Sequence, residues 1–159
     1  MIEFLKTSKL FEGCTVEELH KVAELAQKVE FKFGECIFKA GSLASVIYVI
    51  CDGAVELRFS VTNELAAREL IVTRRFGGDA FGWSALTEHD APYALSAFAM
   101  QDSLLLKLDA ERLKDLCQKN RHLGYHLMKN TTEVIADRFG TMQNLLIEML
   151  RKQLARDQL

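Results

Sequence analysis

Residues 77–99 read GGDAFGWSALTEHDAPYALSAFA, and this stretch carries the strongest fold signal in the chain. Two adjacent glycines, an acid, an aromatic residue and a third glycine come before a short helix-like segment, and Pro92, the chain's one proline, follows it. Glycine allows tight backbone turns, and the amides at the start of a helix attract anions. The pattern therefore predicts a loop whose backbone amides surround an anionic ligand.

The composition is that of a soluble globular protein of one domain. The 159 residues are 49% hydrophobic and 26% charged, and the net charge of −2 gives no general attraction to nucleic acid or to an anionic membrane. The N-terminal MIEFLKTSKLFEG lacks the features of a signal peptide, and apolar runs such as Val46–Cys51 are too short to span a bilayer. We expect a cytoplasmic protein that does not contact membranes.

Residues of about 29–108, which surround the opening stretch, have strand character. Glycines separate short segments of β-branched and aromatic residues, and no helix of sufficient length lies between them. Asp52-Gly53 predicts a type I′ hairpin turn, and alternation of apolar and polar residues from Val55 to Val61 predicts a half-buried strand after it. Many short strands with frequent turns are typical of an antiparallel barrel, sandwich or jelly roll.

Helices are predicted at both ends of this strand region. TVEELHKVAELAQKV, residues 15–29, predicts a short helix that begins with a capping box formed by Thr15 and Glu18. Asp109 is placed to cap a second short helix, AERLKDLCQKN at 110–120.

A long helical region is predicted from about Arg121 to the C-terminus. Gly124 and Gly140 interrupt it and are candidate pivots. An apolar stripe with coiled-coil spacing of 4, 3, 4 and 3 runs along it. We expect this stripe to form a homodimer seam, with docking on the chain's own domain as the alternative. The stripe consists of Ile135, Phe139, Met142, Leu146 and Met149.

Four motifs in this order resemble the cyclic-nucleotide-binding domain of Crp/Fnr-type bacterial regulators and of the regulatory subunits of cyclic-AMP-dependent kinase. They are a helix, GECIFKAG at 34–41, IYVICDGAVEL at 47–57 and GDAFGWSAL at 78–86, and two closing helices follow. The resemblance covers about residues 8–140. It implies a mainly β fold with flanking helices: an eight-stranded antiparallel β-roll, or jelly roll, with an N-terminal helix and a long C-terminal dimerisation helix.

The resemblance also implies a domain division and a binding segment. Residues 1–120 would form the sensor domain with its short closing helix, and 121–159 the helical dimerisation region. In the family, a phosphate-binding cassette presents backbone amides to the cyclic phosphate. The matching positions here are Phe81, Gly82, Ser84, Ala85 and Leu86.

This cassette departs from the family pattern at its two charged positions. The family places a glutamate after the glycine, which holds the ribose 2′-hydroxyl, and an arginine after a proline, which pairs with the phosphate. Trp83 stands at the glutamate position, and Tyr93, followed by Ala94, at the arginine position. Hydrogen bonds to charged groups contribute roughly 1.5–3 kcal/mol each, so two losses weaken binding by about two to four decades. A cyclic AMP receptor of the usual type is disfavoured.

Three interpretations of Trp83 and Tyr93 remain open. The two rings fill the emptied pocket as core, or they line a pocket for a less charged aromatic or small organic molecule. In the third interpretation a nucleotide still binds, and Arg74 or Arg75 supplies the missing positive charge.

Catalysis, metal binding and nucleic-acid binding are not expected. His122 and His126 lie four residues apart, but no HExxH pattern surrounds them, and no catalytic Ser–His–Asp or Cys–His spacing occurs. The four cysteines share no CxxC spacing and are expected to be reduced thiols, so we predict no cofactor. No segment long enough for a helix-turn-helix domain follows the apolar stripe.

These expectations combine into a non-enzymatic sensor module that dimerises through its C-terminal helix and signals by moving that helix, with a small-molecule effector if the pocket is open. One alternative is a dimeric interaction scaffold with a plugged pocket that contacts a protein partner. Another is the ligand-sensing half of a longer Crp/Fnr-type transcription regulator.

Overall fold

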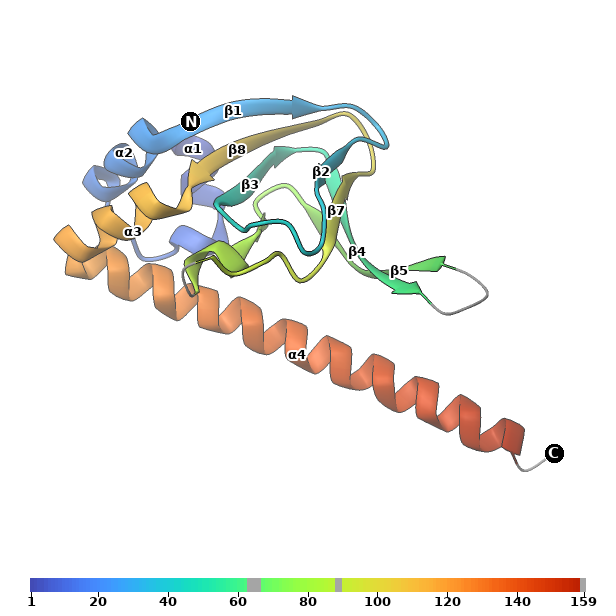
Figure 1. Cartoon of the computed structure of the whole chain (residues 1–159). Coiled ribbons are helices and arrows are strands. Elements are labelled where there is room, and N and C mark those ends of the chain that lie inside the picture. Colours follow the sequence, from blue (N-terminus) through green and yellow to red (C-terminus); the bar gives the residue numbers. More distant parts are fainter. Residues whose placement is uncertain (63–66, 88–89, 158–159) are drawn as a thin grey trace.

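Two antiparallel sheets form the centre of the structure, a computed structural model that describes residues 1–62, 67–87 and 90–157. One sheet has the strand order β1-β8-β3-β6 and the other has the order β2-β7-β4-β5 (Figure 1). The predicted eight-stranded β-roll is thereby confirmed within the described residues. The strands are β1 Ala26–Phe31, β2 Cys36–Phe38, β3 Val46–Asp52, β4 Ala54–Thr62, β5 Ala67–Phe76, β6 Ala80–Phe81, β7 Ser96–Ala99 and β8 Ser103–Asp109.

Apolar side chains form two clusters that hold the sheets and helices together. One cluster joins the two sheets and includes Ile50, Leu57 and Phe81. The other lies under the helices at the opposite end of the roll and includes Leu5, Leu108 and Leu123. The N-terminal elements that cover this second cluster are α1 Ile2–Thr7, η1 Lys9–Phe11 and α2 Val16–Leu25.

The predicted type I′ hairpin at Asp52-Gly53 is wrong. Strands β3 and β4 belong to different sheets, since β3 pairs with β6 and β8, and β4 pairs with β5 and β7. Gly53 has a φ of 99°, and a Cβ at this position would collide with Ser103. The glycine therefore lets the chain cross from one sheet to the other beside β8.

The N-terminal helix α2 begins as predicted but ends four residues earlier. Its capping box is present: Thr15 Oγ1 accepts from the Glu18 amide at 3.3 Å, and Glu18 Oε2 accepts from the Thr15 amide at 2.8 Å. Residues 26–31, which the pattern partly assigned to the helix, instead pair along their whole length with β8. Tertiary pairing overrides a helical pattern at this point.

The predicted alternation in β4 is observed only in part, since Glu56 is buried as well. Val55 and Leu57 are buried, whereas Phe59 is 48% exposed. The pairing of β4 with β5 shifts register between Leu57 and Arg58, and the extra residue, Val72, lies in β5 and not in β4. Phe59 follows Arg58, the last β4 residue that pairs with β7, and it lines a groove with residues of the C-terminal helix.

Two helices close the chain. Asp109 Oδ1 accepts from the Arg112 amide at 2.9 Å and caps α3 Ala110–Lys119. The second helix, α4 Arg121–Asp157, has 37 residues and is therefore about 55 Å long. It passes along the roll and then extends beyond it on the side of the β4–β5 hairpin (Figure 1). From residue 141 to residue 156 every side chain of α4 is exposed.

Candidate functional site

The cassette predicted from the sequence is a short strand, a glycine turn and one turn of 3-10 helix. Gly82, between β6 and η2 Trp83–Leu86, has a φ of 84°. A Cβ on Gly82 would lie 2.8 Å from the Val46 carbonyl oxygen, so only glycine fits there. Phe81, Ala85 and Leu86 are buried and anchor the turn in the apolar core.

Tyr93 is part of the core and is tied to β3. Its hydroxyl donates to the Val46 carbonyl oxygen at 2.7 Å and accepts from the Val46 amide at 3.1 Å. Its ring stacks on Phe38 with centroids 3.7 Å apart, and the residue is only 6% exposed. Burial raises the pKa of Tyr93, while the hydrogen bonds to the backbone act in the opposite direction. A neutral, buried tyrosine therefore occupies the position at which the resemblance implies an arginine.

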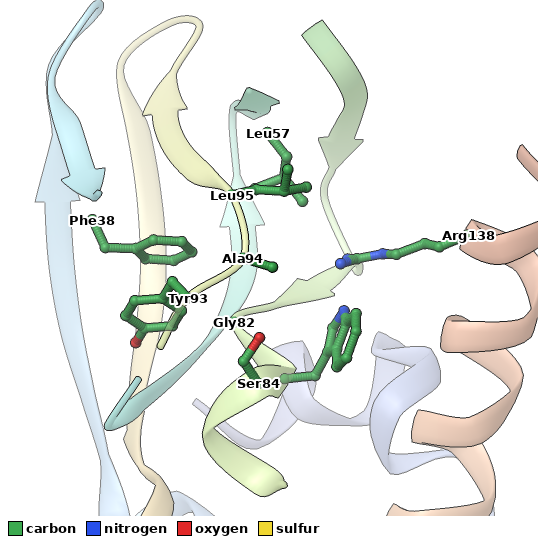
Figure 2. Close-up of a pocket in the computed structure, with 9 residues that line it drawn as sticks. Phe38, Leu57, Gly82, Ser84, Tyr93, Ala94, Leu95 and Arg138 are labelled. Atoms are coloured by element: carbon green, nitrogen blue, oxygen red, sulfur yellow. The ribbon is translucent and has the colours of Figure 1, made fainter. Parts of the chain in front are cut away.

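Little space remains between the cassette and the β-roll. The cavity there has a volume of about 30 Å³, which is enough for one or two water molecules. Figure 2 shows the Phe38 and Tyr93 rings face to face and the Arg138 side chain reaching from α4 toward the same space. The lining residues are Phe38, Leu57, Gly82, Trp83, Ser84, Tyr93, Ala94, Leu95 and Arg138.

Among the described residues, Arg138 is the one charged side chain that lines this cavity, and the sequence reasoning missed it. Its guanidinium lies over the Trp83 ring, 5.4 Å from the centroid, and its Nη2 donates to the Ala80 carbonyl at 3.5 Å. Burial, with a smaller contribution from the charge of Arg75, lowers the pKa of Arg138 to about 10. Arg138 is therefore still cationic at neutral pH. The sequence did contain one indication that Arg138 faces the roll, because it lies between the stripe residues Ile135 and Phe139.

The two cations suggested from the sequence face different surroundings. Arg74 Nε donates to Glu56 Oε1 at 3.0 Å, and Arg58 also pairs with this buried carboxylate. Arg75, one residue further along β5, instead lines a groove beside Trp83 and Arg138. The structure thus brings Arg75, but not Arg74, to the cassette.

The predicted dimer stripe divides into two parts. Ile135, Phe139 and Met142 line the groove between α4 and the β-roll, but Phe139 and Met142 are still 63% and 54% exposed. Leu146 and Met149 lie further along the exposed part of α4 and are 58% and 53% exposed. The described chain leaves this second part of the stripe uncovered.

His122 and two of the four cysteines, Cys14 and Cys117, make contacts within the fold. His122 Nδ1 lies 3.0 Å from both carboxylate oxygens of Glu18 and joins α4 to α2. Burial raises the pKa of Cys14 and of Cys117 to about 11, so both remain protonated thiols at neutral pH. In the described part of the chain, no three His, Cys, Asp or Glu side chains converge in a geometry that would hold a metal ion.

Comparisons with known proteins match the fold and the order of motifs. Residues 28–120 match the sequence profile of the family described as "Cyclic nucleotide-binding domain". The Thermus thermophilus catabolite activator protein superposes with a TM-score of 0.71 at 25% identity, over 90% of this chain and 63% of that one. The regulatory domain of Toxoplasma gondii PKA, crystallised with cAMP, gives a TM-score of 0.67 at 25% identity, over 83% of this chain and 48% of that one.

A curated relative is the Pycsar effector protein BcPycTIR of Burkholderia cepacia. It is 23% identical over 118 residues, which are 74% of this chain and 36% of the relative. The chain thus spans about a third of that protein's length. Among the described helices none is long and apolar enough to cross a membrane.

Proposed function

Because the chain belongs to the cyclic nucleotide-binding domain family, we propose that it is a non-enzymatic regulatory module whose β-roll senses an effector and whose α4 helix transmits the signal. A ligand that contacts both the roll and α4 shifts the position of α4 by its differential affinity for the two states. The proposal includes a homodimer through α4 and excludes cyclic AMP binding in the family manner.

The contacts of Tyr93 are the main support for the proposal that cyclic AMP does not bind in the family manner. Its hydroxyl is bonded to both backbone groups of Val46, and its ring is stacked on Phe38. A cyclic phosphate at this position would meet a neutral phenol in place of a guanidinium. The cavity of about 30 Å³ also leaves no room for a nucleotide unless the aromatic side chains move. The missing charges and the filled space both disfavour cyclic nucleotides.

The exposed end of α4 supports the proposed dimer. Leu146, Met149, Leu150 and Leu154 are each more than half exposed. Contiguous exposed apolar surface marks interaction sites, and two copies of an amphipathic helix can bury it against each other. We therefore assign the part of the stripe beyond Met142 to the dimer seam, where a second copy of α4 would cover it.

Two measurements test the proposal. Calorimetric titration with cyclic AMP and cyclic GMP is expected to give no saturable heat at micromolar concentrations, and such heat would refute the exclusion. Light scattering after size exclusion is expected to give a dimer mass. Leu146→Glu should lower that mass to the monomer's, whereas Lys152→Glu, an equally exposed but polar position on α4, should retain the dimer.

A second candidate is the sensing part of a longer protein. The similarity covers 36% of BcPycTIR and 63% of the Thermus activator, so this module also occurs inside larger chains. An effector domain joined to α4 would receive the same helix movement. The mass of the protein recovered from its native cells distinguishes the two candidates, because a sensing part predicts a mass well above the 18.0 kDa of this chain.

A further inference from the structure

A groove separates α4 from the β4–β5 side of the roll, and we call it the α4 groove. Its volume is about 270 Å³, several times that of the cavity beneath the cassette. Most of its lining is apolar and comes from elements far apart in the sequence. Its apolar walls include Phe59, Val72, Leu95, Ile135, Phe139 and Met142.

The α4 groove contains hydrogen-bond donors from two arginines and from the indole of Trp83. Within the described residues, the buried Nε atoms of Arg75 and Arg138 and the buried Nε1 of Trp83 have no hydrogen-bond partner. All three groups are donors, and both arginines are cations. A buried donor without a partner is costly, and a buried unpaired charge is more so.

Carboxylates lie near these arginines, since Arg75 also lines a second pocket together with Glu12, Asp79, Glu133 and Asp137. Asp79 and Asp137 are close enough to oppose the lowering of the pKa of Arg138, which burial and the charge of Arg75 cause. Among the described residues, however, neither arginine forms an ion pair with either aspartate, and no acidic side chain lines the α4 groove. The Asp79 carboxylate instead accepts from the Phe76 amide at 3.1 Å.

We propose that the α4 groove binds a small amphipathic anion, a carboxylate on an apolar body of about one ring, with the carboxylate held by Arg75, Arg138 and Trp83. A carboxylate offers acceptors only, which matches three donors, and arginine binds it in planar, bidentate geometry. The apolar body would lie between Phe59 and the Ile135 to Met142 face of α4. The site differs from the closed cassette, which it adjoins at Trp83.

This inference rests on the proposed sensor function and specifies its effector. The walls of the α4 groove belong both to the β-roll and to α4, so an anion bound there would tie the helix to the roll. It would also neutralise the repulsion between two arginines that face the same space. Binding would therefore favour the docked position of α4 over any position in which the two arginines separate.

Phenylacetate is the test ligand, with phenylacetamide as its uncharged match. Calorimetry on the whole chain is expected to show saturable binding of phenylacetate and at least tenfold weaker binding of phenylacetamide. Arg138→Met keeps an unbranched side chain but removes the charge, and it should weaken phenylacetate binding by about ten- to a hundredfold. Arg75→Gln should act in the same direction, whereas Arg151→Gln, an exposed arginine on the same helix, should change nothing.

The melting temperature of Arg138→Met shows whether the variant is folded, so that a loss of binding can be assigned to the lost charge. Removing an unpaired buried charge should leave the melting temperature of the ligand-free protein unchanged or higher, and phenylacetate should raise that temperature for the native chain only. The inference is overturned if phenylacetate does not bind the native chain, if phenylacetamide binds equally well, or if neither arginine variant weakens binding. A partner's helix filling the α4 groove would give the first of these results. None of them bears on the dimer mass or on the cyclic nucleotide titration, which test the proposed function separately.

Discussion

Replacing Tyr93 with phenylalanine removes the hydroxyl that links the cassette region to β3 and leaves the ring on Phe38. The lost groups are one hydrogen bond donated to the Val46 carbonyl at 2.7 Å and one accepted from the Val46 amide at 3.1 Å. Each such bond contributes about 0.5–1.5 kcal/mol, so the free energy of unfolding should fall by about 1–3 kcal/mol. The loss should be at the upper end, because the site is only 6% exposed and water cannot easily replace the hydroxyl.

Urea unfolding followed by circular dichroism measures this loss, with Tyr125→Phe as the matched control. Tyr125 is 65% exposed, and its variant should stay within about 0.5 kcal/mol of the native chain. If Tyr93→Phe also stays within that range, the hydroxyl does not hold Val46. The assignment of Tyr93 to the core would then be refuted, and the residue would be free to face a ligand.

Two further predictions concern the helices and the thiols. Gly140→Ala should raise the free energy of unfolding by up to about 1 kcal/mol, since a Cβ there meets nothing within 4 Å. Gly124→Ala should raise it less, because its Cβ would lie 3.0 Å from the Cys117 carbonyl oxygen. Equal increases for the two variants in urea unfolding would contradict the close approach of α3 and α4. Iodoacetamide at pH 8 should modify the exposed Cys36 before Cys14 and Cys117. A pKa of about 11 leaves roughly one thiol in a thousand ionised at Cys14 and Cys117 at this pH. Mass spectrometry of tryptic peptides gives the order of modification, and the opposite order would contradict the burial of these two thiols.

The sequence predicted correctly those features that depend on residues close together in the chain. The capping box of Thr15 and Glu18 and the cap at Asp109 depend on residues within one helical turn, and both form. The glycine turn at Gly82 was also visible in the sequence, although the reason for the glycine, the nearby Val46 carbonyl oxygen, lies far away in the chain.

The sequence could not show which sheet a strand joins or what faces it across the fold. Asp52-Gly53 suits a hairpin, but the same glycine permits the crossing between sheets that the structure contains. Arg138 was missed for a related reason. In the sequence, Arg138 is a single charged residue within an apolar helical stripe. Its contact with Trp83 becomes visible only when α4 is placed beside the cassette.

The central claim is that Trp83 and Tyr93 close the family's nucleotide site. Trp83 is the only tryptophan in the chain, and its fluorescence reports on the cassette and on the α4 groove, which Trp83 also lines. The most direct test is a titration of this emission with cyclic AMP. The account predicts no saturable change at micromolar concentrations. A saturable micromolar response would contradict it.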